Sequence, residues 1–115
     1  MVVGRLVYAS SSILFMGDAE KTLEHQLLWG KSDFLILKSD ILKAGHHGSK
    51  TSTSEDFLQA VSPQFAIISS GRKNRYGHPH QEVIDRLNSL GIKIFRTDLD
   101  RDVRFVSDGK FLYQK

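Results

Sequence analysis

Short apolar runs bounded by turn residues recur along the chain, and the stretches between them carry apolar positions at helical spacing. Runs of this length, rich in Ile, Leu, Val and Phe, predict buried strands. The last two runs flank Asp108-Gly109, a dipeptide typical of a hairpin turn. The predicted strands cover residues 2–8, 13–17, 40–44, 65–69 and 92–95, and those of the closing hairpin cover 103–106 and 111–113.

Three of the intervening stretches predict helices. The first ends at Gly30, a residue that favours helix termination. The second begins at Ser52 and Glu55, which have the spacing of a capping box, and Pro63 ends it. The helices are expected over residues 19–29, between 52 and 63 and over about 79–90, and the apolar run 34–37 is ambiguous.

The alternation of strand and helix predicts an α/β fold. In such folds the loops that follow parallel strands gather at one edge of the sheet, where ligands usually bind. Loops at this edge are therefore the first place to look for functional residues.

Composition narrows the class of protein. The chain has 115 residues, 40% hydrophobic and 25% charged, which fits one small domain or part of one. No apolar run approaches the roughly 18–20 residues of a membrane span. The absence of cysteine excludes disulfides, thiolate metal ligands and a cysteine nucleophile.

Four of the five histidines fall in two short loops, each after an apolar run. The first loop contains His46 and His47 between glycines, and the second contains His78 and His80 around a proline. Upstream, another apolar run ends in Gly17-Asp18. A carboxylate and imidazoles at the ends of successive strands are ligands that suit Zn²⁺ or Mn²⁺. Two simpler roles stay open: Asp18 fits a helix N-cap, and His78 or His80 fits the cap of the following helix.

Four segments in this order resemble the metallo-β-lactamase-fold domain of the ComEC competence proteins, which carry DNA across bacterial membranes. The same pattern occurs in related phosphorylcholine esterases and small-molecule hydrolases. The segments are LFMGDAE at 14–20, LKAGHHGSKTS at 42–52, AIISSG at 66–71 and NRYGHPH at 74–80.

The resemblance implies half of an αβ/βα metallo-β-lactamase sandwich, a mixed sheet with helices packed on one face. The family's first metal motif, a His-x-(His/Asp)-x-Asp-His loop, is absent, since no histidine precedes His25. Residues 1–115 therefore resemble a single partial domain, the C-terminal half. In the intact domain two Zn²⁺ or Mn²⁺ ions are expected, with weak or no metal binding by this chain alone.

The resemblance also implies roles for individual residues. Asp18 matches the metal-bridging carboxylate, and His47, or less readily His46, matches the late histidine ligand. The other histidine of the pair, taken as His46, would be catalytic and face the scissile phosphate, while His78 stays open as an alternative ligand. The residues expected to surround the substrate phosphate are Ser49, Lys50, Thr51, Asn74, Arg75, Tyr76, His78 and His80.

The function implied by the family is phosphodiester hydrolysis by a metal-dependent phosphodiesterase or nuclease that serves DNA uptake. Basic residues beside the histidine loops, such as Lys50 and Arg75, favour a polyanionic substrate such as DNA. The parent would be a bacterial membrane protein in which this domain is extracytoplasmic, completed by an N-terminal half-domain and a membrane channel.

An alternative function is a non-catalytic α/β module that binds nucleic acid or a partner chain. The missing ligands favour this alternative for the chain by itself. Half of a sandwich would expose one face of its sheet, and a large exposed apolar patch usually marks an interface. We therefore also expect a homodimer or aggregation in solution.

Overall fold

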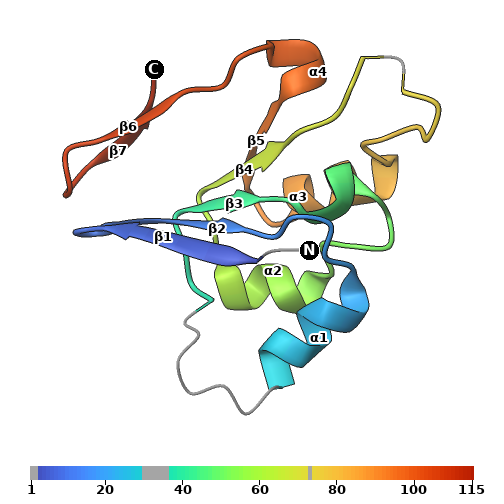
Figure 1. Ribbon diagram of the computed structural model, residues 1–115, viewed down its shortest axis with the longest axis horizontal. Coiled ribbons are helices and arrows are strands. Elements are labelled where there is room, and N and C mark those ends of the chain that lie inside the picture. Colours follow the sequence, from blue (N-terminus) through green and yellow to red (C-terminus); the bar gives the residue numbers. More distant parts are fainter. Residues whose placement is uncertain (1–2, 30–36, 73) are drawn as a thin grey trace.

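The computed structural model describes residues 3–29, 37–72 and 74–115, which form one five-stranded sheet and a small two-stranded sheet (Figure 1). The order in the large sheet is β1-β2-β3-β4-β5; β1 is antiparallel to β2, and the other neighbours are parallel. The strands of the large sheet are β1 (Gly4–Tyr8), β2 (Ser11–Phe15), β3 (Ile41–Lys43), β4 (Phe65–Ile68) and β5 (Lys93–Arg96), and those of the small sheet are β6 (Phe105–Ser107) and β7 (Leu112–Gln114).

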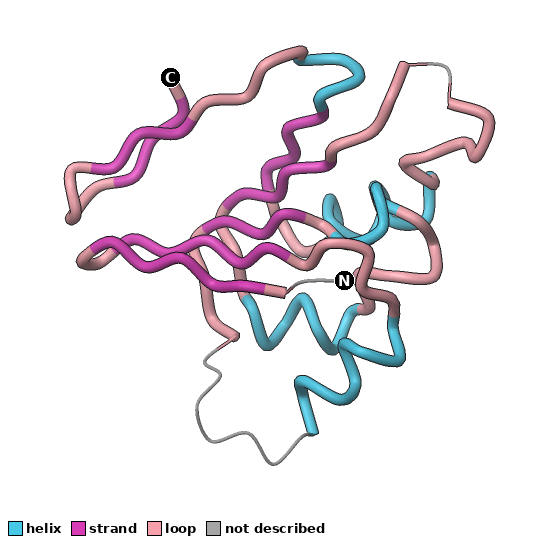
Figure 2. Tube along the Cα trace, viewed as in Figure 1, coloured by secondary structure: helices cyan, strands magenta, loops and turns pink. Residues whose placement is uncertain are grey.

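Helices connect the parallel strands, as the tube drawing shows (Figure 2). The expectation of an α/β fold with a mixed sheet and helices is confirmed. No helix within the described ranges is long and apolar enough to cross a membrane. The helices are α1 (Lys21–Trp29), α2 (Glu55–Val61), α3 (Gln81–Ser89) and the short α4 (Thr97–Asp100), with a 3-10 segment η1 (Gly45–Gly48) after β3.

One face of the large sheet packs against the helices and forms the core. Alternate residues of the strands point to this face, among them Leu14, Leu42 and Ile68, all fully buried. They meet the apolar stripes of α2 and α3, where Phe57 and Leu87 are also fully buried. Burial of each such side chain contributes about 1.5–3 kcal/mol, so this layer is the main source of stability.

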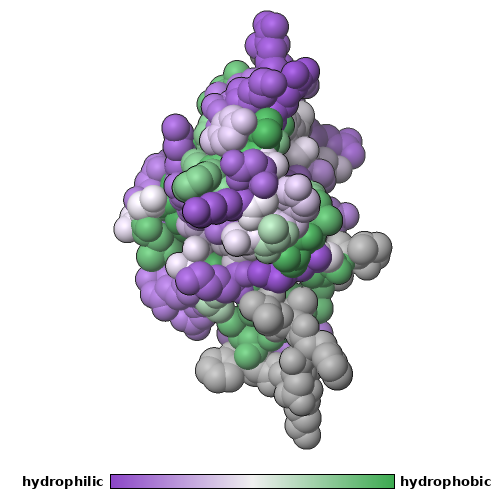
Figure 3. Space-filling model, turned by 90° about the vertical axis from the view of Figure 1, so that its left-hand side faces the viewer, coloured by the Kyte–Doolittle hydropathy of each residue, from purple (hydrophilic) through white to green (hydrophobic). Residues whose placement is uncertain are grey.

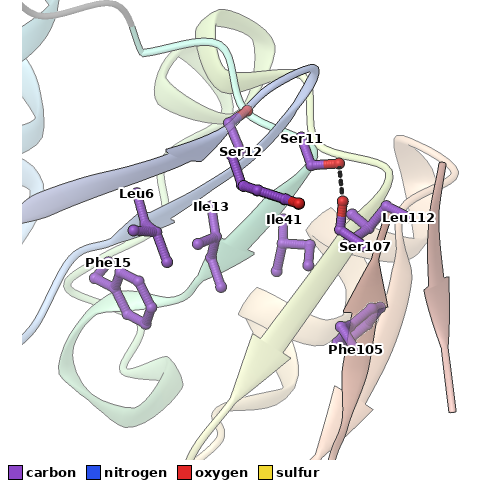
Figure 4. Close-up of a pocket in the computed structure, with 10 residues that line it drawn as sticks. Leu6, Ser11, Ser12, Ile13, Phe15, Ile41, Phe105, Ser107 and Leu112 are labelled. Atoms are coloured by element: carbon purple, nitrogen blue, oxygen red, sulfur yellow. Dashed lines mark hydrogen bonds between the residues drawn. The ribbon is translucent and has the colours of Figure 1, made fainter. Parts of the chain in front are cut away.

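The opposite face of the sheet is covered only in part, by the β6–β7 hairpin. Phe105 of the hairpin packs against Phe65 and Phe95, with ring centres 5.0 and 5.3 Å away. Beside this contact lies a cleft of about 240 Å³, walled by the hairpin and by apolar residues of β1, β2 and β3 (Figure 4). Ser11 and Ser107 join its walls through a hydrogen bond of 2.6 Å. Hydrophobic patches also reach the surface on the side shown in Figure 3.

Several local expectations need correction. The N-cap of α2 is Ser54, whose hydroxyl accepts from the N–H of Phe57, and not Ser52. The Ser52 hydroxyl is fully buried and lies 2.9 Å from the carbonyl oxygens of both Gly45 and Ser49, which share its one proton. It therefore links the two ends of the first histidine loop. Most strands and helices start or stop one or two residues from the predicted bounds, and most of the ambiguous run 34–37 lies outside the described residues.

A buried carboxylate that the sequence pattern did not reveal links α1 to α2. Glu24 is fully buried, and its carboxylate accepts hydrogen bonds from the main-chain N–H groups of Thr53 and Ser54. Arg86 of α3 donates to the carbonyl oxygen of the same Thr53. These bonds fix the turn that leads from the first histidine loop into α2.

Candidate functional site

The parallel order of β2, β3 and β4 brings Asp18 and both histidine loops to one edge of the sheet. Main-chain hydrogen bonds hold the loops together there: the N–H of His46 donates to the carbonyl of Gly17 over 2.8 Å, and that of His80 to Gly48 over 3.0 Å. Residues from three separate segments therefore share one site, as the strand pattern predicts.

The two adjacent histidines have strained backbones. His46 (φ 48°, ψ 46°) and His47 (φ 54°, ψ 27°) both adopt the left-handed conformation, which costs a non-glycine residue of the order of 1 kcal/mol. The flanking glycines are required by space, because a Cβ at Gly45 would lie 2.5 Å from the Ala19 carbonyl oxygen and one at Gly48 2.7 Å from Pro79. Strain of this kind clusters at functional sites.

Hydrogen bonding fixes the orientation and the tautomer of His47. Its Nδ1 lies 2.8 Å from the carbonyl oxygen of Ser69, which can only accept, so Nδ1 carries the proton. In the neutral ring the lone pair is then on Nε2, which lies 3.8 Å from Oδ1 of Asp18. Two acceptors facing each other repel unless a proton or a cation lies between them.

His46 lies next to Glu20 and lines the same hollow as Asp18 and His47. Its Nδ1 is 3.0 Å from Oε1 of Glu20, yet the angles do not suit a hydrogen bond and this buried nitrogen has no hydrogen-bond partner among the described residues. The two side chains are therefore in close contact without a hydrogen bond between them. Sequence reasoning missed Glu20 because nothing in its spacing distinguishes it from a surface carboxylate.

His78 lies among the other histidines and Tyr76. Its ring is nearly parallel to those of Tyr76 and His47, at interplanar angles of 24° and 21°, and it meets His46 and His80 edge-on. Desolvation lowers the pKa of His78, and the neighbouring histidines lower it further. His78 is therefore neutral at pH 7.

His80 braces the two loops against each other. The main-chain N–H of Lys50 donates to its Nδ1 over 2.8 Å, so the ring proton is on Nε2, which lies 3.1 Å from the carbonyl oxygen of Tyr76. Both ring nitrogens are thus engaged within the protein. His80 also occupies the N-cap position of α3, but its side chain makes no capping hydrogen bond.

The residues expected around a phosphate differ in accessibility. Lys50, Thr51 and Arg75 are exposed, whereas Ser49 is buried and its hydroxyl bonds to that of Thr51 over 2.9 Å. The Asn74 side chain points toward the protein and forms hydrogen bonds with both the N–H and the carbonyl of His78. The exposed members can reach a ligand, and Ser49 and Asn74 position the loops.

Lys43, at the end of β3, faces the partly covered side of the sheet near this edge. Burial lowers the pKa of its ammonium group, and the nearby Asp18 carboxylate counteracts part of that effect. Its Nζ donates to the carbonyl oxygen of Ala44 over 3.3 Å. The alternation of strand residues between the two faces of the sheet could have identified Lys43 as half-buried.

The structure brings together the donors expected to bind metal but does not complete a site. Within the described ranges, no group of three His, Asp or Glu side chains is arranged to hold a metal ion. Asp18 and His47 form the best pair, and a catalytic zinc site usually has three protein ligands. The residues present therefore do not fit a closed metal centre.

Comparisons with known proteins place this chain beside proteins of genetic competence. It is 44% identical over 94 residues to ComE operon protein 3 of Bacillus subtilis, which covers 82% of this chain and 12% of that protein. It is 42% identical over 101 residues to Competence protein ComA of Neisseria gonorrhoeae, covering 88% of this chain and 14% of that protein. Recombination protein 2 of Haemophilus influenzae is 42% identical over 94 residues, covering 82% of this chain and 11% of that protein.

These relatives correct the family assignment made from the motifs. Their names are those of competence and recombination proteins; none names ComEC, a metallo-β-lactamase or a hydrolase, and no family model matches the chain. The ComEC metallo-β-lactamase assignment is therefore withdrawn, together with the phosphodiesterase or nuclease activity and the catalytic role of His46. The chain spans only 11–14% of the length of these three relatives.

Proposed function

We propose that this chain is a nucleic-acid-binding module of a competence protein, which contacts the phosphodiester backbone of DNA during uptake. The observation that carries the proposal is the convergence of the two histidine loops, with the exposed cations Lys50 and Arg75, at one edge of the sheet. Similarity to competence proteins supports DNA as the polyanion.

The charges at this edge favour an anionic ligand. Among the described residues Lys50 and Arg75 form no ion pair, so their charges are available to phosphates. Asp18 and Glu20 oppose a phosphate, but both lie beside imidazoles that offset their charge when protonated. Contacts of this type supply affinity without reading sequence.

We also propose that Asp18 and His47 bind a divalent cation, Zn²⁺ or Mn²⁺, weakly. The hydrogen bond from His47 Nδ1 to a backbone carbonyl is the arrangement that usually orients metal-binding histidines. With two protein ligands in place of three, this chain alone would bind the ion with micromolar or poorer affinity. A second ion would need ligands from outside this chain.

The chain would work within a longer protein. We propose that this module is extracytoplasmic in a membrane protein with a channel, and that the partly covered sheet face is half of a sandwich. Another part of that protein, or a second copy of this chain, would complete the sandwich. The apolar cleft beside the β6–β7 hairpin supports this arrangement.

The test is DNA binding measured by fluorescence anisotropy at several salt concentrations. We expect log affinity to fall linearly with log salt, and the slope to decrease by about 0.7–0.9 for each phosphate-contacting cation removed. Lys50→Ala and Arg75→Ala should each show this decrease. Lys110, an exposed lysine in the β6–β7 turn, supplies the matched control, and Lys110→Ala should leave the slope unchanged. Absence of DNA binding at low salt, or equal slopes in all three variants, would refute the proposal.

A further inference from the structure

Tyr76 is one exposed end of a row of three near-parallel rings. Its side chain is 62% exposed. Its ring centre lies 5.7 Å from that of His78, which lies 6.2 Å from that of His47. The row thus links the loop after β3 to the loop after β4, and His47 at its other end is also exposed.

The loop that carries Tyr76 is held in place by its neighbours. Asn74 bonds to the main chain of His78 at both its N–H and its carbonyl, over 2.8 and 2.7 Å, and also to the carbonyl of Gly71. His80 approaches the carbonyl of Tyr76 itself. A loop held in this way loses little conformational freedom when a ligand stacks on its tyrosine.

We propose that Tyr76 is a stacking platform for an unpaired base, so that the module prefers single-stranded to double-stranded nucleic acid. This inference rests on the proposed function and deepens it by naming the ligand's form. Tyr76 and His78 line two adjoining hollows of about 190 and 220 Å³, which leave room beside the ring.

The chemistry of bases explains the preference. Bases in a duplex stack on one another, whereas a single strand offers each base face to an aromatic side chain. Arg75 adds a cation over the platform: its guanidinium carbon lies over the Tyr76 ring, 5.1 Å from the centre, and it donates to the tyrosine hydroxyl over 2.9 Å. A base that stacks on this face takes the place of the exposed guanidinium, which moves aside. A base on Tyr76 would place its phosphate within reach of this charge.

The experiment compares wild type, Tyr76→Ala and Tyr76→Phe in binding three labelled ligands: single-stranded oligothymidine, an abasic strand of equal length and a duplex. Removal of the ring should weaken binding of oligothymidine by roughly 5- to 150-fold, the range for one stacked base. Tyr76→Phe keeps the ring and should stay close to wild type. The abasic strand and the duplex should bind all three proteins alike.

Tyr113→Ala is the matched control, because Tyr113 is a comparably exposed tyrosine on β7, 52% exposed. Far-UV circular dichroism verifies that each variant is folded. An equal loss for abasic and base-containing strands, or no loss in Tyr76→Ala, would overturn the stacking role while leaving DNA binding intact. If wild type binds none of the ligands, the proposed function fails and the stacking role fails with it.

Discussion

Replacement of Glu24 tests whether the buried carboxylate between α1 and α2 holds the structure together. Its side chain is fully buried and accepts hydrogen bonds from two main-chain N–H groups, those of Thr53 and Ser54. Thr53 itself has a positive φ of 58°, so the same bonds stabilise an unfavourable backbone conformation. Glu24→Ala removes the acceptor and leaves both donors in place.

The expected loss follows from those two donors. A buried N–H group left without an acceptor costs about 1–3 kcal/mol, which gives roughly 2–6 kcal/mol for the pair. Water that enters the vacated space recovers part of this, so we expect Glu24→Ala to lower the free energy of unfolding by about 2–4 kcal/mol. Glu24→Gln keeps one acceptor oxygen and should lose less. A domain of this size is stable by only about 5–15 kcal/mol, so either change is large enough to measure.

Urea denaturation followed by circular dichroism measures the change. Gln26→Ala is the control, because Gln26 is an exposed residue of the same helix and its loss should change stability by less than about 0.5 kcal/mol. A loss below about 1 kcal/mol for Glu24→Ala would show that the two hydrogen bonds do not stabilise the fold and would refute the reasoning.

Three further predictions concern the site and its pH dependence. Calorimetry should show Zn²⁺ binding at micromolar or poorer affinity, and His47→Ala and Asp18→Asn should each abolish it. Nanomolar binding by a monomer would contradict the inference that two protein ligands leave the metal site incomplete. Because burial and neighbouring histidines lower the pKa of His78, its NMR signals should titrate below the usual 6.5, and stability should fall as pH drops through that range; titration at or above 6.5 would count against the geometry. The hydrogen bond from Arg96 lowers the pKa of Asp98, so its stabilisation should be complete above the usual 3.8 and be lost as pH falls further; Asp98→Asn should remove this dependence in acid unfolding.

The fold class could be predicted because it depends on the periodicity of apolar residues. The runs at 65–69 and 92–95 became β4 and β5 with nearly the expected bounds, and α3 follows its apolar stripe. Helix boundaries are predicted less accurately, because a serine hydroxyl can either cap a helix or bond to a nearby loop carbonyl. Ser52 has capping-box spacing, but two carbonyl oxygens of the histidine loop share its hydroxyl proton, and Ser54 takes the capping position.

The site could be predicted only as a group of residue types at one edge of the sheet. The structure brings Asp18, His47 and His78 together as expected, since parallel strands end at one edge. The sequence could not show which ring nitrogens are free, because that depends on backbone partners from other segments. The Ser69 carbonyl sets the tautomer of His47, and no sequence pattern marks a carbonyl.

The distinction between the histidines follows from this bonding. His80 has both nitrogens engaged, by Lys50 and by the Tyr76 carbonyl, and so acts as a brace between the loops. His47 has one nitrogen engaged and the other directed at Asp18, where only a proton or a cation relieves the repulsion. Of these two histidines, His47 is therefore the one with a ring nitrogen not engaged by the main chain, while His80 holds the two loops against each other.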